Sequence, residues 1–91
     1  MAGKCDLPLH GLTVVVDTAG PRIYMGRYDF EDDNRLVLNH AEVRDLAAGE
    51  TKEAILEKAA RVGIFVNHDR IQISRSEITS IRRLSEFDSV D

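Results

Sequence analysis

The stretch of the sequence that most constrains the fold is IQISRSEITSI, residues 71–81, in which four isoleucines surround a polar interruption. Ser74 and Glu77 have the spacing of a capping box, so one interpretation is a helix that begins here. In the other interpretation, the residues SRSE form a tight turn between two strands, and the second strand begins at Ile78. The first interpretation adds a helix to the protein, and the second completes a sheet.

The residue types favour two strands. Residues 78–81 are Ile-Thr-Ser-Ile, which all come from the weaker part of the helix propensity scale, and isoleucine and threonine are enriched in strands. Strands expected earlier in the chain also need partners for their edges. We therefore expect strand, turn, strand, with the helix as the open alternative.

Three short strands joined by tight turns are expected before this segment. The β-branched run LTVVVD is followed by Gly20-Pro21, a strong turn signal because glycine allows unusual backbone angles and proline ends a hydrogen-bonded ladder. The next turn is EDDN, whose side chains can accept hydrogen bonds from nearby backbone amides. The strands are expected at residues 12–17, 23–30 and 35–41, which is the pattern of a meander.

The second of these strands is expected to bend. Tyr24, Tyr28 and Phe30 fall on one side of it, because side chains alternate along a strand. Gly26 lies between them, and a glycine inside a strand is typical of a bend. A strongly curved sheet needs such a position.

A helix at about residues 50–62 is expected after the third strand. Ile55, Ala59 and Val62 have the i, i+4, i+7 spacing of one apolar face, and Gly63 can cap the C-terminal end. A helix of this length is marginal alone, so its apolar face is expected to pack on the rest of the protein. After it, IFV and RIQI return to strand character on either side of a turn-like NHD.

Length and charge limit the domain organisation and the function. A chain of 91 residues with 43% apolar residues is expected to form one domain at residues 12–84, between a flexible arm at 1–11 and an acidic tail at 85–91. The formal net charge of −4 argues against an overall basic surface, so any nucleic-acid contact would come from a local patch.

The cysteine content and the hydropathy indicate the cellular setting. Cys5 is the only cysteine, which excludes an internal disulfide and a thiolate zinc cluster and is consistent with a reducing compartment. No apolar run approaches the roughly 20 residues of a membrane span, and the first residues are too polar for a signal peptide. We expect a cytoplasmic protein without membrane contact.

No pattern in the sequence indicates an enzyme. His10, His40 and His68 are well separated and lack a second ligand at the spacing of a metal site. The acidic run EDD is typical of a turn, because a calcium site needs six to eight oxygens from a longer loop. No nucleophile has a base in register, and there is no phosphate-binding glycine loop. We therefore expect no catalytic residue, no metal site and no cofactor.

Two groups of residues have spacings that occur together in one known family. The first is an apolar strand, a turn glycine, a second glycine between two aromatic residues and then an aspartate: VVVD, Gly20, Tyr24, Gly26, Tyr28 and Asp32. The second has isoleucines around a polar turn: Ile73, Ile78 and Ile81. With these two motifs, the sequence resembles the Sm-like family (Sm, LSm and Hfq proteins) over about residues 12–84.

The resemblance implies a mostly β fold, a small five-stranded bent-sheet barrel with the helix inserted between strands three and four. It also implies a non-catalytic protein whose copies pair at exposed strand edges into a homo-oligomeric ring. Such a ring would bind RNA or another single-stranded nucleic acid at its opening. The alternative is an oligomeric scaffold or protein-interaction module that does not bind RNA.

The predicted nucleic-acid contacts are Asn34, Arg35, Ser74 and Arg75. In the family, bases are held by a stacking residue, an asparagine and an Arg-Gly pair, and these positions correspond here to Asn34, Leu36 and Ser74-Arg75. The chain thus lacks an aromatic platform, and base stacking contributes roughly 1–3 kcal/mol per base. Arg75 is expected to face the ring opening, where a ring would repeat its charge on every subunit.

Overall fold

The computed structural model describes residues 11–87. Of the expected N-terminal arm, all but Gly11 lies outside the described residues, as do residues 88–91 of the expected tail. The elements, in chain order, are β1 (Thr13–Thr18), β2 (Arg22–Glu31), β3 (Arg35–Asp45), α1 (Lys52–Val62), β4 (His68–Ser74), the 3-10 helix η2 (Arg75–Glu77), β5 (Ile78–Arg83) and the 3-10 helix η3 (Leu84–Phe87).

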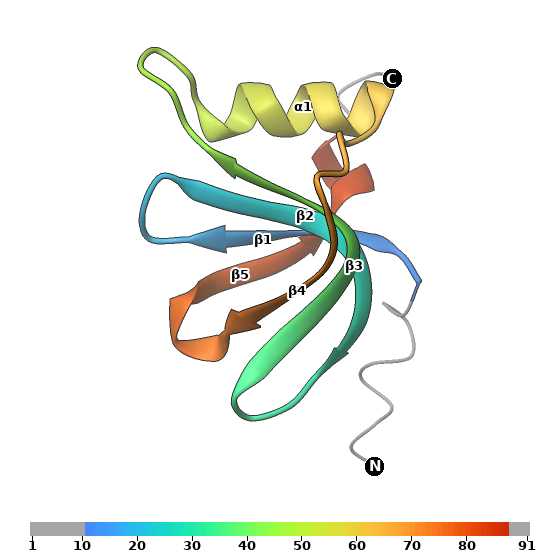
Figure 1. Ribbon diagram of the computed structural model, residues 1–91. Coiled ribbons are helices and arrows are strands. Elements are labelled where there is room, and N and C mark those ends of the chain that lie inside the picture. Colours follow the sequence, from blue (N-terminus) through green and yellow to red (C-terminus); the bar gives the residue numbers. More distant parts are fainter. Residues whose placement is uncertain (1–10, 88–91) are drawn as a thin grey trace.

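The predicted fold class is confirmed. Five strands form one bent antiparallel sheet in the order β4-β3-β2-β1-β5, and α1 lies across one end of it, between β3 and β4 in sequence (Figure 1). The isoleucine-rich segment folds as strand, turn, strand, so the helical alternative is wrong. β4 and β5 are the two edges of the sheet, each paired with one other strand.

The pairing of β2 with β3 is irregular where Gly26 meets β3. The pairing of β2 with β3 shifts between Met25 and Arg27, and His40 on the opposite strand has a positive φ of 50°. A Cβ on Gly26 would lie 2.9 Å from the Cβ of Ala41, closer than two such carbons can approach. Glycine is required at this position because the backbone of β3 lies against it, as the sequence predicted.

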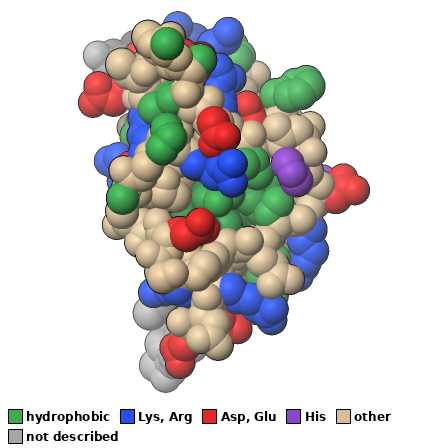
Figure 2. All heavy atoms as spheres, turned by 60° about the vertical axis from the view of Figure 1, so that its left-hand side comes forward, with side chains coloured by type: hydrophobic (Ala, Val, Ile, Leu, Met, Phe, Trp, Pro, Cys, Tyr) green, Lys and Arg blue, Asp and Glu red, His purple; other side chains and the backbone are tan. Residues whose placement is uncertain are grey.

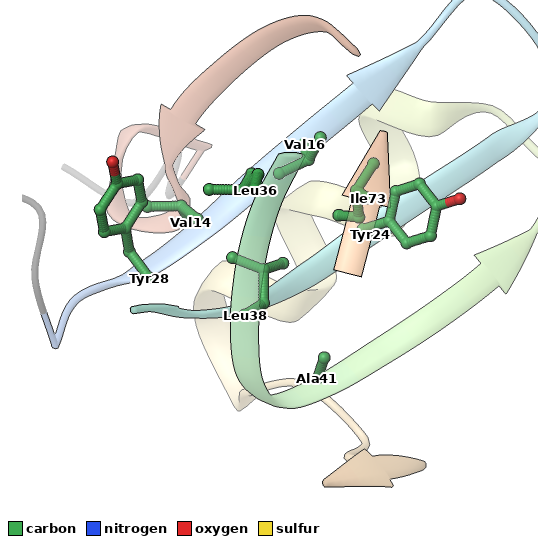
Figure 3. Close-up of a cluster of buried hydrophobic side chains, with 8 residues drawn as sticks. All are labelled: Val14, Val16, Tyr24, Tyr28, Leu36, Leu38, Ala41 and Ile73. Atoms are coloured by element: carbon green, nitrogen blue, oxygen red, sulfur yellow. The ribbon is translucent and has the colours of Figure 1, made fainter. Parts of the chain in front are cut away.

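One hydrophobic cluster lies inside the bend. Its buried side chains come from four strands, point toward one another in Figure 3, and are Val14, Val16, Tyr24, Tyr28, Leu36, Leu38, Ala41 and Ile73. The partly buried Ile71, Ile78 and Ile81 pack against it from the two edge strands. Of the three aromatic residues predicted to share a face of β2, Tyr24 and Tyr28 are in this cluster and Phe30 is not, because the pairing with β3 shifts between Tyr28 and Phe30.

A second cluster joins the other face of the sheet to α1. Val15, Ile23 and Met25 pack there against Leu56 and Ala59 of the helix, with Leu84 of η3 beside them. The predicted helical face is partly wrong, because Val62 is 68% exposed whereas Leu56 is only 5% exposed. The helix packs through Ile55, Leu56, Ala59 and Ala60, so its covered face is centred between Leu56 and Ala59, and Val62 lies to one side of it.

The ends of α1 are set by local hydrogen bonds. The side chain of Thr51 accepts a hydrogen bond from the backbone N–H of Ala54, and Glu53 lies in the first turn, where negative charge is favoured. At the other end, Gly63 has φ 96° and donates its backbone N–H to Ala59, as predicted for a glycine cap. Within residues 11–87, no helix is long and apolar enough to cross a membrane.

The connection from α1 to β4, residues 64–67, is not a strand, so the prediction of strand character for residues 64–66 is wrong. It runs beside β3 but is held mainly through side chains: the Phe65 N–H donates to the carboxylate of Glu42 at 2.9 Å. The side-chain amide of Asn67 bonds to both the N–H and the C=O of Val43. These contacts replace the backbone ladder, which begins with His68 opposite Ala41.

Candidate nucleic-acid interface

Two turns, about forty residues apart in the sequence, meet at one corner of the sheet. Arg35 is paired with Ser74 at the last position of the β3 to β4 ladder. The backbone N–H of Arg75 then donates to the C=O of Asn34 at 3.0 Å. The four residues predicted from the sequence, Asn34, Arg35, Ser74 and Arg75, are therefore neighbours.

The turn between β2 and β3 is closed by Asp32. Its carboxylate accepts hydrogen bonds from the backbone N–H of Asn34 at 2.9 Å and from that of Arg35 at 3.0 Å. The Asn34 bond first, and then the Arg35 bond and charge, hold the pKa of Asp32 below its ordinary value. The exposed side chain of Asn34 makes no hydrogen bond within residues 11–87, so its amide is free to bind a ligand.

Arg35 is half-buried and already contacts three side chains. It donates to the side chain of Gln72 on β4 at 3.1 Å and lies 3.6 Å from the Asp32 carboxylate. Its guanidinium also stands over the ring of Phe30, 5.5 Å from the centroid. These contacts fix its direction, and its side chain remains 44% exposed.

Arg75 forms an ion pair with Glu31, at the end of β2. The other oxygen of the Glu31 carboxylate accepts a hydrogen bond from the hydroxyl of the buried Tyr28 at 2.7 Å. Beside this pair is a cavity of about 290 Å³ lined by the two charged residues and by Ile78, Thr79, Ser80 and Ile81. The sequence interpretation missed Glu31, because the acidic run that contains it was assigned to the turn alone.

Ser74 and Leu36, the other two positions of the family motifs, are both engaged within the protein. The hydroxyls of Ser74 and Ser76 are hydrogen-bonded to each other at 2.9 Å within the turn. Leu36, which stands at the asparagine position of the family motif, is fully buried in the cluster inside the bend. It is part of the core and cannot contact a base.

Charge at this corner is mixed in sign. Arg35 and Arg75 lie beside Glu31 and Asp32, and Asp33 is exposed in the same turn. On the face drawn in Figure 2, basic and acidic side chains are likewise interspersed around a group of hydrophobic side chains. Within residues 11–87, no three histidine, cysteine, aspartate or glutamate side chains are grouped so that they could hold a metal ion.

Comparison with known proteins identifies the architecture. No protein-family model matches the chain, and no curated protein matches its sequence. Among solved structures, an Sm protein of Pyrococcus abyssii in complex with a uridine heptamer matches with a TM-score of 0.59 at 16% identity, over 91% of this chain and 97% of that chain. The chain has an Sm-like fold.

The same Sm-like fold also occurs in a different setting. A chain from the NatC complex bound to a Gag peptide and CoA matches with a TM-score of 0.58 at 17% identity, over 89% of this chain and 93% of that chain. A chain from the NatC complex bound to CoA matches with a TM-score of 0.55 at 19% identity, over 87% and 88% of the two chains. Proteins with this fold therefore include both an RNA-bound Sm protein and a component of a protein complex.

Proposed function

We propose that this protein is a non-catalytic, ring-forming subunit that binds single-stranded RNA at the corner formed by Asn34, Arg35, Ser74 and Arg75. The observation that carries the proposal is the meeting of these residues at a corner whose two bordering strands, β4 and β5, are both open edges.

The open edges support assembly. A strand at the edge of a sheet presents unpaired backbone N–H and C=O groups, which favour pairing with another chain. β4 and β5 lie at opposite ends of the strand order, so β4 of one copy can pair with β5 of the next. Contacts of this head-to-tail kind generate a closed ring when the rotation between copies closes.

The corner supports ligand binding of a particular kind. The two arginines can bind phosphates, and the free amide of Asn34 can bind base edges. The aromatic side chain at the corner, Phe30, lies under the Arg35 guanidinium, so most of the binding energy would come from phosphate contacts. Such binding is strongly weakened by salt. Repetition of the corner around a ring would multiply these modest contacts.

A titration with short oligouridine and oligoadenine at a low and a high salt concentration tests the proposal. We expect binding that weakens as salt rises and that is lost in Arg75→Ala. Arg27→Ala is the control, because Arg27 is an exposed arginine of β2 outside the corner. Equal losses in both variants would indicate a general charge effect and would contradict a site at the corner.

A second candidate is an oligomeric scaffold without RNA binding. The ion pair between Glu31 and Arg75 favours it, because the carboxylate occupies the cation that a phosphate would need. The net charge of −4 also favours a scaffold that does not bind RNA. An oligomer that binds neither oligonucleotide at low salt would support the scaffold, whereas a monomeric mass at micromolar protein would contradict both candidates.

A further inference from the structure

Large exposed hydrophobic side chains are concentrated at the end of α1. Val62 is 68% exposed, Phe65 is 76% exposed and Val66 is 45% exposed. They belong to the last turn of the helix and to the connection toward β4. Val62 and Phe65 also line a groove of about 340 Å³ between the helix and the sheet, with Met25, Ile55 and Ile64 among its apolar walls. We call Val62, Phe65 and Val66 the connection patch.

The charges around the connection patch are mainly basic. Lys58 lines the same groove, and Arg61 lies in the last turn of α1; neither forms a hydrogen bond or an ion pair within residues 11–87. The acid of the groove, Glu42, is only 7% exposed and accepts the Phe65 N–H, with Arg44 at 3.8 Å. A partner that fits this surface therefore carries apolar side chains and carboxylates.

The topology indicates which part of a second copy would reach the patch. If β4 pairs antiparallel with β5 of a neighbour, the start of β4 at His68 lies near the neighbour's end of β5 at Arg83. The connection patch lies just before His68, and η3 follows just after Arg83. The edge that would pair the strands thus continues directly into the patch on one copy and into η3 on the other.

The neighbour's η3 has the required chemistry. This segment, Leu84–Phe87, carries the partly buried Phe87 and the exposed Glu86, whereas Leu84 is buried in the second cluster of its own copy. Glu86 is exposed, and its carboxylate lies 3.9 Å from the Nε of Arg83, a distance typical of a weak surface pair. Its charge is available to complement the basic rim of the groove.

We propose that the connection patch is the docking surface for η3 of an adjacent copy, with Glu86 of that copy near Lys58. This inference rests on the proposed ring assembly and adds a second contact to it, outside the paired strands. In this arrangement the inserted helix α1 serves the subunit interface, because it carries Val62 and the exposed Lys58.

Phe65→Ser tests the apolar part of the interface, with Phe65→Leu as its matched control. Burial of a large apolar side chain stabilises by about 1.5–3 kcal/mol, so we expect Phe65→Ser to raise the dissociation constant of the oligomer about tenfold to a hundredfold. Phe65→Leu retains an apolar side chain and is expected to assemble like the unmodified protein. Sedimentation velocity over a dilution series measures both, and circular dichroism checks that both variants are folded.

A charge exchange tests the polar part. Lys58→Glu and Glu86→Lys are each expected to weaken assembly, and the double variant is expected to restore it toward the original level. An oligomer whose dissociation is unchanged by Phe65→Ser, or by both single charge variants, would overturn this inference and leave ring assembly through β4 and β5 intact. A protein that is monomeric without any substitution would overturn both.

Discussion

The carboxylate of Glu31 forms an ion pair with the guanidinium of Arg75, and so joins the end of β2 to the turn after β4. The same carboxylate is oriented by the hydroxyl of Tyr28, which is 1% exposed. An anion is thus fixed beside the cation that is the best candidate for a phosphate contact. Under the proposed function, this fixed anion would compete with a bound phosphate for Arg75.

Glu31→Gln is expected to strengthen oligonucleotide binding. The amide keeps an oxygen for the Tyr28 hydroxyl but no longer neutralises Arg75. An exposed ion pair contributes about 0.2–1 kcal/mol, so the gain in affinity should be modest, about two- to fivefold. Fluorescence anisotropy with labelled oligoadenine at low salt measures it. An affinity that falls in Glu31→Gln would mean that Glu31 contacts the ligand rather than competing with it.

Gly26→Ala is expected to destabilise the protein by about 1–3 kcal/mol, the usual cost of forcing extra atoms into a packed position. The added Cβ would lie 2.9 Å from the Ala41 Cβ and 3.2 Å from the Asn39 carbonyl oxygen, so the backbone of β3 must move. Gly20→Ala is the control, because nothing lies within 4 Å of a Cβ at that turn. Urea unfolding of the two variants measures the difference, and equal stabilities would argue against close packing at the bend.

Leu56→Ala is expected to lower the free energy of unfolding by about 2–4 kcal/mol, because it leaves a cavity between α1 and the sheet. Val62→Ala, on the same helix, is expected to change it by less than about 0.5 kcal/mol when measured on dissociated protein, since Val62 is mostly exposed. Thermal unfolding at low protein concentration compares the two. A larger loss in Val62→Ala would contradict the observed face of the helix.

Asn67→Asp tests whether Asn67 holds the connection against β3 through its side-chain amide or serves only as a turn residue. The Asn67 amide accepts from the Val43 N–H at 3.0 Å and donates to the Val43 C=O at 3.2 Å. Aspartate suits a turn but has no N–H to donate, and its charge would face the carbonyl oxygen. We therefore expect Asn67→Asp to be at least as destabilising as Asn67→Ala, at about 0.5–1.5 kcal/mol in urea unfolding. Full stability of the aspartate variant would show that Asn67 serves only as a turn residue.

Acid is expected to destabilise the protein through carboxylates that the fold holds ionised. Backbone N–H groups, with Arg35, lower the pKa of Asp32, and the hydrogen bond and charge of Arg22 lower the pKa of Asp45. Their stabilising effect is complete above the ordinary aspartate pKa of 3.8 and is lost as the pH falls through the lower folded-state values.

Melting temperatures between about pH 6 and about pH 3 measure this effect. The melting temperature of the unmodified protein should fall most steeply at the acid end of that range. Asp32→Asn should have a lower melting temperature at neutral pH and a shallower decline toward acid. Parallel curves for the two proteins would show that Asp32 does not contribute to the pH dependence.

Local residue chemistry was sufficient to predict much of this fold. Strand periodicity, Gly20-Pro21 and the acidic turn located the first three strands, and Gly26 indicated the bend. The turn between β4 and β5 followed from residues that are poor helix formers and good strand formers. The four residues of the candidate site also followed from their positions in motifs, since the two turns that carry them are defined locally by the chain.

Other features depended on contacts between distant segments, which sequence periodicity does not encode. The i, i+4, i+7 pattern selected Val62 for the buried face of α1, but the packing of the helix against the sheet and η3 covers Leu56 instead. The connection at residues 64–66 has strand-forming residues, yet side chains of Glu42 and Asn67 take the place of backbone pairing there. Likewise, the partnership of Glu31 with Arg75 exists only because the bent sheet brings the ends of β2 and β4 to one corner. The sequence by itself determined which segments are strands and turns, because those preferences are local, and the tertiary structure decided which side chains are buried or neutralised, because that depends on what the bend brings together.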